Sequence, residues 1–459
     1  MSTIAAISTA TGAGGIGIIR MSGEECFKIL KKIFIPSNTK VDVEHVEGYT
    51  IKYGYIIDFK TKEKIDEVLV SFFRAPKSYT TENMCEINSH GGVIVERKIL
   101  EQCLLNGAKL AEPGEFTKKA FLNGRIDLSQ AESVIDIINA KTDREAKASF
   151  SQLQGKLSKV IKGIREELLN VMADIEASID YPEYDIEETT YSKVKSLLNK
   201  TKEKLKLLEK SFNSGKILKD GVKTVIIGKP NSGKSSLLNT ILDEERAIVS
   251  EVEGTTRDTI EEFVSIKGIP LKIIDTAGIR NTDDFVEKIG VEKAINLIDE
   301  SDLIIAIFDS SKKLEKEDFE ILNLIKNKKT IILLNKSDIS PKNNETINYI
   351  SKINKSVIKA SMKTKEGIEN LYNEIVSLFE NKEINLNDGI VITNIRHKNV
   401  IHKAIEYVQN AIININDGMT IDIVAIYIKN ILEILGEITG DNVSEDIINT
   451  IFSKFCLGK

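Results

Sequence analysis

The chain is poor in cysteine and has no long apolar run in its 459 residues. Its four cysteines form no Cys-x-x-Cys pair and have no histidine spacing suited to zinc, a pattern that suits free thiols in a reducing compartment. The longest apolar runs, such as Leu303–Phe308, are far too short to span a bilayer. The first residues lack a basic region followed by an apolar block, so no secretory signal is expected. We therefore expect a cytoplasmic protein without membrane association.

An excess of basic charge is also absent, because 63 Lys and Arg residues face 69 Asp and Glu residues, for a formal net charge of −6. The molecule as a whole therefore carries no field that would hold a polyanion. A nucleic-acid partner would need a local basic face or a second protein. The length predicts about three domains. Hydrophobic residues at 41% and charged residues at 29% exclude wholesale disorder.

Residues 1–118 are rich in glycine, threonine, tyrosine and β-branched residues. Short alternating runs at Val68–Phe73 and Met84–Asn88 indicate strands, and helices are expected after Ser22 and His90. This part of the chain predicts an α+β domain.

Residues 119–215 have the apolar period of 3.6 that is typical of helices. Ser129, with Glu132 three residues later, predicts a capping box at the start of one helix. An apolar stripe over residues 157–179 predicts a second, long helix that ends at Pro182. We expect the first part of a helical domain here.

Residues 216–380 alternate strand-length apolar runs with helical patterns. Repeated βα units predict a mostly parallel sheet that is covered on both faces. Within the segment 262–274, a break at Gly268-Ile269-Pro270 predicts a hairpin that adds an antiparallel edge strand. The apolar runs are Val222–Ile227, Leu271–Ile274, Leu303–Phe308, Thr330–Leu334 and Ser356–Ile358.

Residues 381–459 return to helical patterns from Asn394 onward, and Ser444 is expected to cap the last helix. Helices thus flank the α/β segment on both sides. Such an insertion is possible where the two ends of a domain lie close together. The predicted fold is therefore a multidomain α/β protein in which a Ras-like P-loop domain is inserted into a helical domain.

Residues 228–235 carry the P-loop pattern G-x-x-x-x-G-K-S. The pattern stands between a buried strand and a helical run, where glycines let backbone N–H groups wrap phosphates and the helix N-terminus adds positive potential. Lys234 is expected to reach the β- and γ-phosphates, and Ser235 to ligate Mg²⁺. The other expected contacts are Asn231, Ser232, Gly233 and Ser236.

Asp275-Thr276-Ala277-Gly278 follows the next buried strand. Its aspartate is placed to hold Mg²⁺ through water, and its glycine can bring a backbone N–H against the γ-phosphate. Thr256, in the candidate switch 254–258, could complete the Mg²⁺ shell. The next residue is Ile279, where Ras-like proteins carry a glutamine that orients water. Hydrolysis therefore needs another group to position the water.

Asn335-Lys336-Ser337-Asp338 closes a predicted strand and indicates the base. Asp338 can accept hydrogen bonds from N1–H and the 2-amino group of guanine, while the stem of Lys336 lies along the ring. Adenine lacks this donor pair and would leave a carboxylate unpaired. Ser361-Met362-Lys363 is placed to give a backbone N–H to the guanine oxygen. These motifs predict a domain that binds GTP.

At these residues the chain resembles the TrmE family of tRNA-modification GTPases over essentially its full length. The shared segments are the P-loop with Asn231, GTTRD at 254–258, DTAGIR at 275–280, VEKIG at 286–290, HGG at 90–92, PGEFTKKAFLNGRIDL from Pro113 and the ending FCLGK. The resemblance implies hydrolysis of GTP to GDP and phosphate, regulated by dimerisation of the G domains.

The resemblance also implies a K⁺ ion close to the place of an arginine finger, where a cation stabilises charge on the transferring phosphoryl group. Asn231 would ligate it through its side chain. Glu287 matches the catalytic glutamate of the family, which positions the attacking water and fills the vacancy left by Ile279. Backbone oxygens would come from Ser250, Val252 and Thr255.

In the resemblance, residues 1–118 form a domain that dimerises and binds 5-formyl- or methylene-tetrahydrofolate. Glu86 could accept hydrogen bonds from the pterin, and basic residues could face the glutamate tail. Cys456 lies near this site, either as a reactive thiol or as a buried small hydrophobe. The matching positions are Arg20, Glu86, Arg125 and Lys459.

The family acts with an FAD-dependent partner, MnmG (GidA), to add a carboxymethylaminomethyl or aminomethyl group at C5 of the tRNA wobble uridine. The protein is thus expected to be a homodimer that also binds tRNA. Ten lysines between Lys193 and Lys223 are either a solvated helix face or an RNA-binding patch. Two other functions are open: a ribosome-assembly GTPase of the Era or EngA kind, and a folate-dependent transferase with the G domain as a scaffold.

Overall fold

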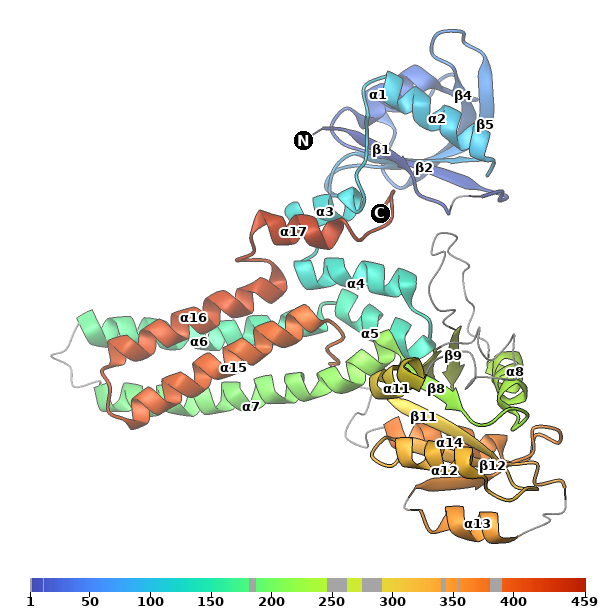
Figure 1. Ribbon diagram of the computed structural model, residues 1–459. Coiled ribbons are helices and arrows are strands. Elements are labelled where there is room, and N and C mark those ends of the chain that lie inside the picture. Colours follow the sequence, from blue (N-terminus) through green and yellow to red (C-terminus); the bar gives the residue numbers. More distant parts are fainter. Residues whose placement is uncertain are drawn as a thin grey trace. The chain divides into compact units, whose positions relative to one another are not determined.

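The computed structural model describes residues 2–10, 12–180, 187–245, 262–274, 291–339, 344–353, 355–379 and 390–459 (Figure 1). These residues divide into two compact units. The first comprises Met1–Ile135, Leu153–Glu166 and Leu432–Lys459, and the second comprises Asp136–Gln152 and Glu167–Ile431. None of the described helices is both long enough and apolar enough to cross a membrane.

The first unit is built on a seven-stranded sheet with the order β3-β4-β5-β6-β2-β1-β7. Only the β1–β7 pair is parallel among the described strands of this sheet. Two helices, α1 (Cys26–Ile33) and α2 (Val93–Leu105), pack on one face, so the predicted strands and helices of this region are confirmed. The strands are β1 (Ile4–Ile7), β2 (Gly17–Ser22), β3 (Phe34–Pro36), β4 (Thr50–Ile57), β5 (Lys64–Phe73), β6 (Met84–Ser89) and β7 (Lys109–Leu110).

The two faces of this sheet differ in chemistry because successive side chains of a strand point to opposite faces. Ile19, Met21 and Ile87 pack under α1 and α2 and are completely buried. Arg20 and Glu86, which alternate with them, face the other way and stand directly opposite each other in the β2–β6 register. The register thus places two charged residues from distant segments on one face.

Helix α4 (Leu128–Asn139) begins before the predicted capping box, so that prediction is wrong. Asp127 and Gln130 form the reciprocal pair instead: each side chain accepts the backbone N–H of the other at 3.0 Å. Ser129 lies within the helix, and its hydroxyl donates to Asp127 at 2.9 Å. The earlier start buries Leu128 completely against Phe452, which favours this helix start.

Two shorter helices of this unit are α3 (Glu115–Leu122) and α17 (Glu445–Phe452). Ser444 precedes α17 as predicted, but its side chain makes no capping hydrogen bond.

Long helices carry the chain to and from the α/β segment. Helix α7 continues past the predicted boundary at residue 215 and lies along α15 (Figure 1). The N–H of Ile392 donates to the Ser211 hydroxyl at 3.1 Å, and a Cβ on Gly215 would lie 2.0 Å from the Ile392 carbonyl oxygen. The two connections therefore meet, as the predicted insertion requires. These helices are α5 (Asp143–Leu153), α6 (Lys156–Asp180), α7 (Glu187–Asp220), α15 (Ile395–Asn416) and α16 (Ile421–Thr439); Pro182, predicted to end α6, lies outside the described residues.

The α/β segment contains a six-stranded sheet with the order β13-β12-β11-β8-β10-β9. All its described pairs are parallel except β10–β9. Helices α8 and α14 cover one face and α11, α12 and α13 the other, which confirms the predicted layers. The elements are β8 (Val222–Ile227), α8 (Lys234–Glu245), β9 (Glu262–Ile266), β10 (Ile269–Ile273), α11 (Val291–Glu300), β11 (Leu303–Asp309), α12 (Lys316–Leu324), β12 (Thr330–Asn335), α13 (Asn344–Ser351), β13 (Ser356–Lys359) and α14 (Ile368–Phe379).

The β9–β10 hairpin is tighter than predicted. Ile266 stands opposite Ile269, so Lys267 and Gly268 alone make the turn. Both have left-handed backbones, with φ of 48° and 83°, as the favoured two-residue hairpin turn requires. Pro270, which was expected to break the segment, instead belongs to β10.

Candidate functional site

A pocket of about 310 Å³ lies where β8, β12 and β13 end. The loops after parallel strands meet at one edge of the sheet, so motifs far apart in the sequence converge there. The pocket unites the P-loop with both predicted base-recognition segments. Its walls are Asn231, Gly233, Lys234, Ser235, Ser236, Asn335, Lys336, Asp338, Ile339, Ser361, Met362 and Lys363; of these, Ile339 was missed, although it directly follows Asp338.

Lys234 lies across the P-loop with only 5% of its surface exposed. Its ammonium group donates to the carbonyl oxygens of Gly228 and Lys229, each at 2.9 Å. A buried charge needs such partners. Asn231, between these residues, has a left-handed backbone with φ of 62°. The loop is thus curled around the lysine that is expected to contact phosphate.

Asn335 connects the phosphate end of the pocket to its base end. It is buried, and its amide nitrogen donates to the carbonyl of Ser232 at 2.7 Å. Its amide oxygen accepts the N–H of Met362 at 3.1 Å. A Cβ on Gly233, whose φ is 109°, would lie 2.1 Å from the same amide nitrogen, so only glycine allows this approach. Sequence analysis missed this connection because it depends on two distant loops.

The residues predicted to recognise the base are held by neighbouring polar groups. The Ser361 hydroxyl donates to a carboxylate oxygen of Asp338 at 2.7 Å. Lys336, with φ of 65°, pairs with Asp309 at 2.7 Å. Burial alone would raise the pKa of Asp309, but hydrogen bonds from Lys336 and Ser311 outweigh it and hold the pKa below its ordinary value. Sequence reasoning missed Asp309, whose only signal is its place at the end of β11.

The backbone of the 361–363 segment is partly engaged within the protein. The N–H of Ser361 donates to Glu366 at 3.0 Å, and that of Met362 to Asn335. The segment is expected to give a backbone N–H to guanine. Of its three N–H groups, only that of Lys363 lacks a protein acceptor within the described part of the chain. Which of the three meets guanine stays a prediction.

The remaining predicted residues of the nucleotide and K⁺ sites are Ser250, Val252, Thr255, Thr256, Asp275, Thr276, Ala277, Gly278 and Glu287, and these lie outside the described residues, as does Ile279. Ser235 stands on the pocket wall beside Lys234, where a hydroxyl oxygen suits Mg²⁺. Among the residues described, no three His, Cys, Asp or Glu side chains gather as a metal cluster.

A second polar site lies on the open face of the N-terminal sheet. Arg20 donates through Nε and Nη2 to one oxygen of Glu86, at 2.9 and 2.7 Å, and through Nη1 to the carbonyl of Gly458 at 3.3 Å. The Tyr79 ring lies near two guanidinium groups: its centroid is 5.7 Å from Cζ of Arg20 and 4.8 Å from Cζ of Arg125. The carbonyl of Lys459 accepts the N–H of Phe116 at 3.1 Å, and the Phe116 ring lies beside Arg20. Tyr79 and Phe116, which sequence analysis missed, thus connect the four residues of the predicted folate site.

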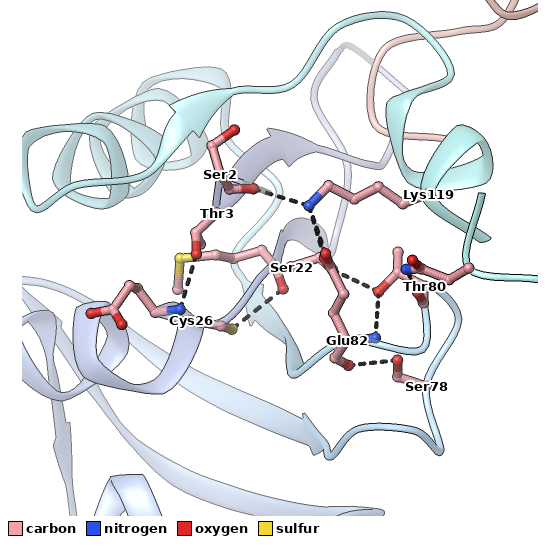
Figure 2. A network of polar contacts seen from close by, with 11 residues as sticks. Ser2, Thr3, Ser22, Cys26, Ser78, Thr80, Glu82 and Lys119 are labelled. Carbon is pink, nitrogen blue, oxygen red and sulfur yellow. Dashed lines mark hydrogen bonds and ion pairs between the residues drawn. The ribbon is translucent and has the colours of Figure 1, made fainter. Parts of the chain in front are cut away.

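A buried network fixes the loop that carries Tyr79 (Figure 2). Lys119, with a side chain only 4% exposed, donates to both carboxylate oxygens of Glu82 at 2.8 and 3.0 Å and to the carbonyl of Ser2 at 2.9 Å. Ser22 donates to the same carboxylate at 2.9 Å and contacts Thr80 at 2.6 Å. The position of Tyr79 is therefore tied to a charge pair inside the domain.

The cysteines are all free, and Cys456 is exposed, so its interpretation as a buried small hydrophobe is wrong. Cys26, Cys85 and Cys103 are completely buried. A hydrogen bond from Cys26, together with burial, raises the pKa of the Cys85 thiol. Of the four, only Cys456 is accessible to a reagent.

The second unit holds a P-loop nucleotide-binding domain of the GTPase class, with a mostly parallel sheet and with the P-loop and the N-K-x-D segment at the same edge.

Comparison with known proteins extends this assignment to the whole chain. Residues 128–456 match the MnmE helical domain, and residues 3–125 match the N-terminus of the GTP-binding protein TrmE. The tRNA modification GTPase MnmE of Acetivibrio thermocellus is 51% identical over 100% of this chain and 99% of its own, and that of Clostridioides difficile is 50% identical with the same coverage. Among solved structures, translation elongation factor SelB of Methanococcus maripaludis, in complex with a GTP analogue, is 19% identical over 36% of this chain and 34% of its own, with a TM-score of 0.27. The chain belongs to the MnmE family of tRNA modification GTPases.

Proposed function

We propose that this GTPase hydrolyses GTP to GDP and phosphate in the pocket at the ends of β8, β12 and β13, in the cytoplasm. It acts with the FAD-dependent MnmG on tRNA, adding a carboxymethylaminomethyl or aminomethyl group at C5 of the wobble uridine. The observation that carries the GTPase part is the Asn335 side chain, which joins the phosphate loop to the base loop. The tRNA part rests on the names of relatives that match the full length of the chain.

In this proposal the two ends of the pocket have different tasks. Lys234 exchanges its carbonyl partners for phosphate oxygens, and Asp338, oriented by Ser361, accepts the donor edge of guanine. Ser235 and Thr256 hold Mg²⁺. The K⁺ site uses Asn231 with Ser250, Val252 and Thr255, and Glu287 positions the attacking water.

The site around Arg20 and Glu86 would bind 5-formyl- or methylene-tetrahydrofolate. The guanidinium groups of Arg20 and Arg125, with Lys459 as a third basic residue, suit a ligand that carries carboxylates, and the rings of Tyr79 and Phe116 suit its flat ring system. The folate supplies the one-carbon unit when it is bound. Cys456, exposed near the chain end at Gly458, remains a candidate reactive thiol.

A homodimer through the N-terminal sheet is part of the same proposal. The open face of β3, β4 and β5 exposes a group of large apolar side chains: Ile35, Ile51, Tyr53 and Leu69. Apolar patches of this kind mark interfaces. Tyr53 stands directly opposite Leu69 in the strand register, so the patch is continuous across strands.

The test is GTP turnover of the purified chain in KCl and in NaCl at equal ionic strength. We expect strong stimulation by K⁺ alone, and its loss when the Asn231 amide is removed. Asn231→Gly is the better variant, since Asn231→Ala would add strain at φ of 62° and confuse ligand loss with loop distortion. Equal, slow turnover in both salts would reject the K⁺ mechanism and favour a ribosome-assembly GTPase that awaits an external activator.

A further inference from the structure

Helix α7 divides its lysines between two faces. Lys193, Lys200 and Lys204 point to α6, where they form ion pairs with Asp174 and Glu167 at 3.9, 3.4 and 3.0 Å. Their charge is therefore largely balanced within the protein.

A second set of lysines has no such partners. Lys195, Lys202, Lys206 and Lys210 recur at intervals of seven, four and four residues, so they form one stripe along the helix. Within the described part of the chain none of the four forms an ion pair, and all but the half-exposed Lys202 are exposed. The stripe extends about 22 Å at 1.5 Å per residue.

Acidic residues near the stripe neutralise it only in part. Glu209 contacts His402 of α15 at 2.7 Å and is a carboxylate beside the stripe. Glu203 lies on the flank of the stripe, between Lys202 and Lys206 in sequence, and is exposed. Four lysines thus stand beside two carboxylates of the same helix, which leaves an excess of positive charge.

We infer that this lysine stripe of α7 binds the phosphate backbone of tRNA. That the RNA is tRNA rests on the proposed function. The net charge of the chain is −6, so this chain can contact RNA only through a local basic surface, unless a second protein holds the RNA. A lysine carries a point charge on a flexible side chain, so it suits contacts with phosphate groups that do not depend on the base sequence. Protein interfaces are instead depleted in lysine and enriched in aromatic residues at their centres. Residues 195–210 of α7 include no aromatic residue, which favours RNA over an acidic protein.

The test compares two triple variants of the full chain that remove equal charge from the same helix. One is Lys202→Gln/Lys206→Gln/Lys210→Gln on the stripe, and its matched control is Lys193→Gln/Lys200→Gln/Lys204→Gln on the ion-paired face. Binding of a tRNA transcript with uridine at the wobble position is measured across a salt series. Each lost phosphate contact lowers the slope of log K against log[salt] by about 0.7–0.9. We expect the stripe variant to lose about 2–3 units of slope and the control to keep the wild-type slope. Circular dichroism confirms that both variants are folded.

Four outcomes separate the stripe from the function on which it rests. A loss confined to the stripe variant supports the inference. Equal losses in both variants overturn it, because net charge alone would then decide. Unchanged binding in both variants also overturns it and leaves tRNA as the partner at another surface. In the last outcome the wild-type chain binds no tRNA, and the stripe variant no longer binds MnmG although the wild type does. The stripe is then a protein-docking surface, and tRNA binding by this chain is rejected as well.

Discussion

Replacing Asn335 by alanine tests whether the two ends of the nucleotide pocket are mechanically coupled. The substitution leaves the carbonyl of Ser232 and the N–H of Met362 without the partner that each has now, at 2.7 and 3.1 Å. An unsatisfied buried polar group costs about 1–3 kcal/mol. We expect the cost of one unsatisfied group to be subtracted from the free energy of GDP binding, because the nucleotide needs both loops in place. A loss of about 1–3 kcal/mol raises the dissociation constant for GDP roughly 5- to 150-fold.

Isothermal titration with GDP measures this change. Ser337→Ala is the matched control, since its partly exposed hydroxyl makes only a long contact of 3.4 Å with Glu366 within the same loop region. The control should bind GDP like the wild type. GDP affinity that is unchanged in Asn335→Ala, with a lowered unfolding temperature, would refute the coupling and leave Asn335 with a purely structural role.

Three further predictions concern folding, pH and assembly. Lys119→Met should lower the free energy of unfolding by about 3–5 kcal/mol, measured in urea, because Glu82 keeps an unpaired charge; adding Glu82→Gln should recover part of the loss, and no recovery would contradict the ion-pair argument. Burial raises the pKa of Glu145 to about 7 from 4.5, so the native state holds a proton that the unfolded chain releases in this range. The free energy of unfolding should therefore fall as pH rises from about 4.5 to 7. Glu145→Gln keeps an acceptor for the N–H of Lys141 and carries no charge. This variant should unfold at a higher temperature than the wild type at pH 8, but not at pH 4. Leu69→Lys should halve the mass measured by light scattering, whereas Leu207→Lys, at a more exposed leucine of α7, should leave it unchanged.

The nucleotide pocket was largely predictable because each of its motifs is local. The P-loop and the N-K-x-D segment each occupy a few consecutive residues after a buried strand, and parallel strands bring such loops to one edge. The expected multidomain architecture and the layers of the second sheet followed from apolar periodicity in the same way.

Helix starts were less predictable, since several polar residues compete for the capping position. Ser129 and Glu132 have the spacing of a capping box, but Asp127 and Gln130 form it. The difference is decided by the burial of Leu128 against the C-terminal aromatic cluster, which is more than three hundred residues away in the sequence. Local propensity cannot register a contact over that distance.

By itself, then, the sequence determined the chemistry of the phosphate and base loops, the periodicities of the helices and strands, and the family. Tertiary structure alone decided that Asn335 joins Ser232 to Met362, that Arg20 faces Glu86, and that the lysines of α7 fall into a paired face and an unpaired stripe. The physical reason is the same in each case. A side chain's type and spacing set what it can bind, but whether it meets a partner or solvent depends on which distant segment packs beside it.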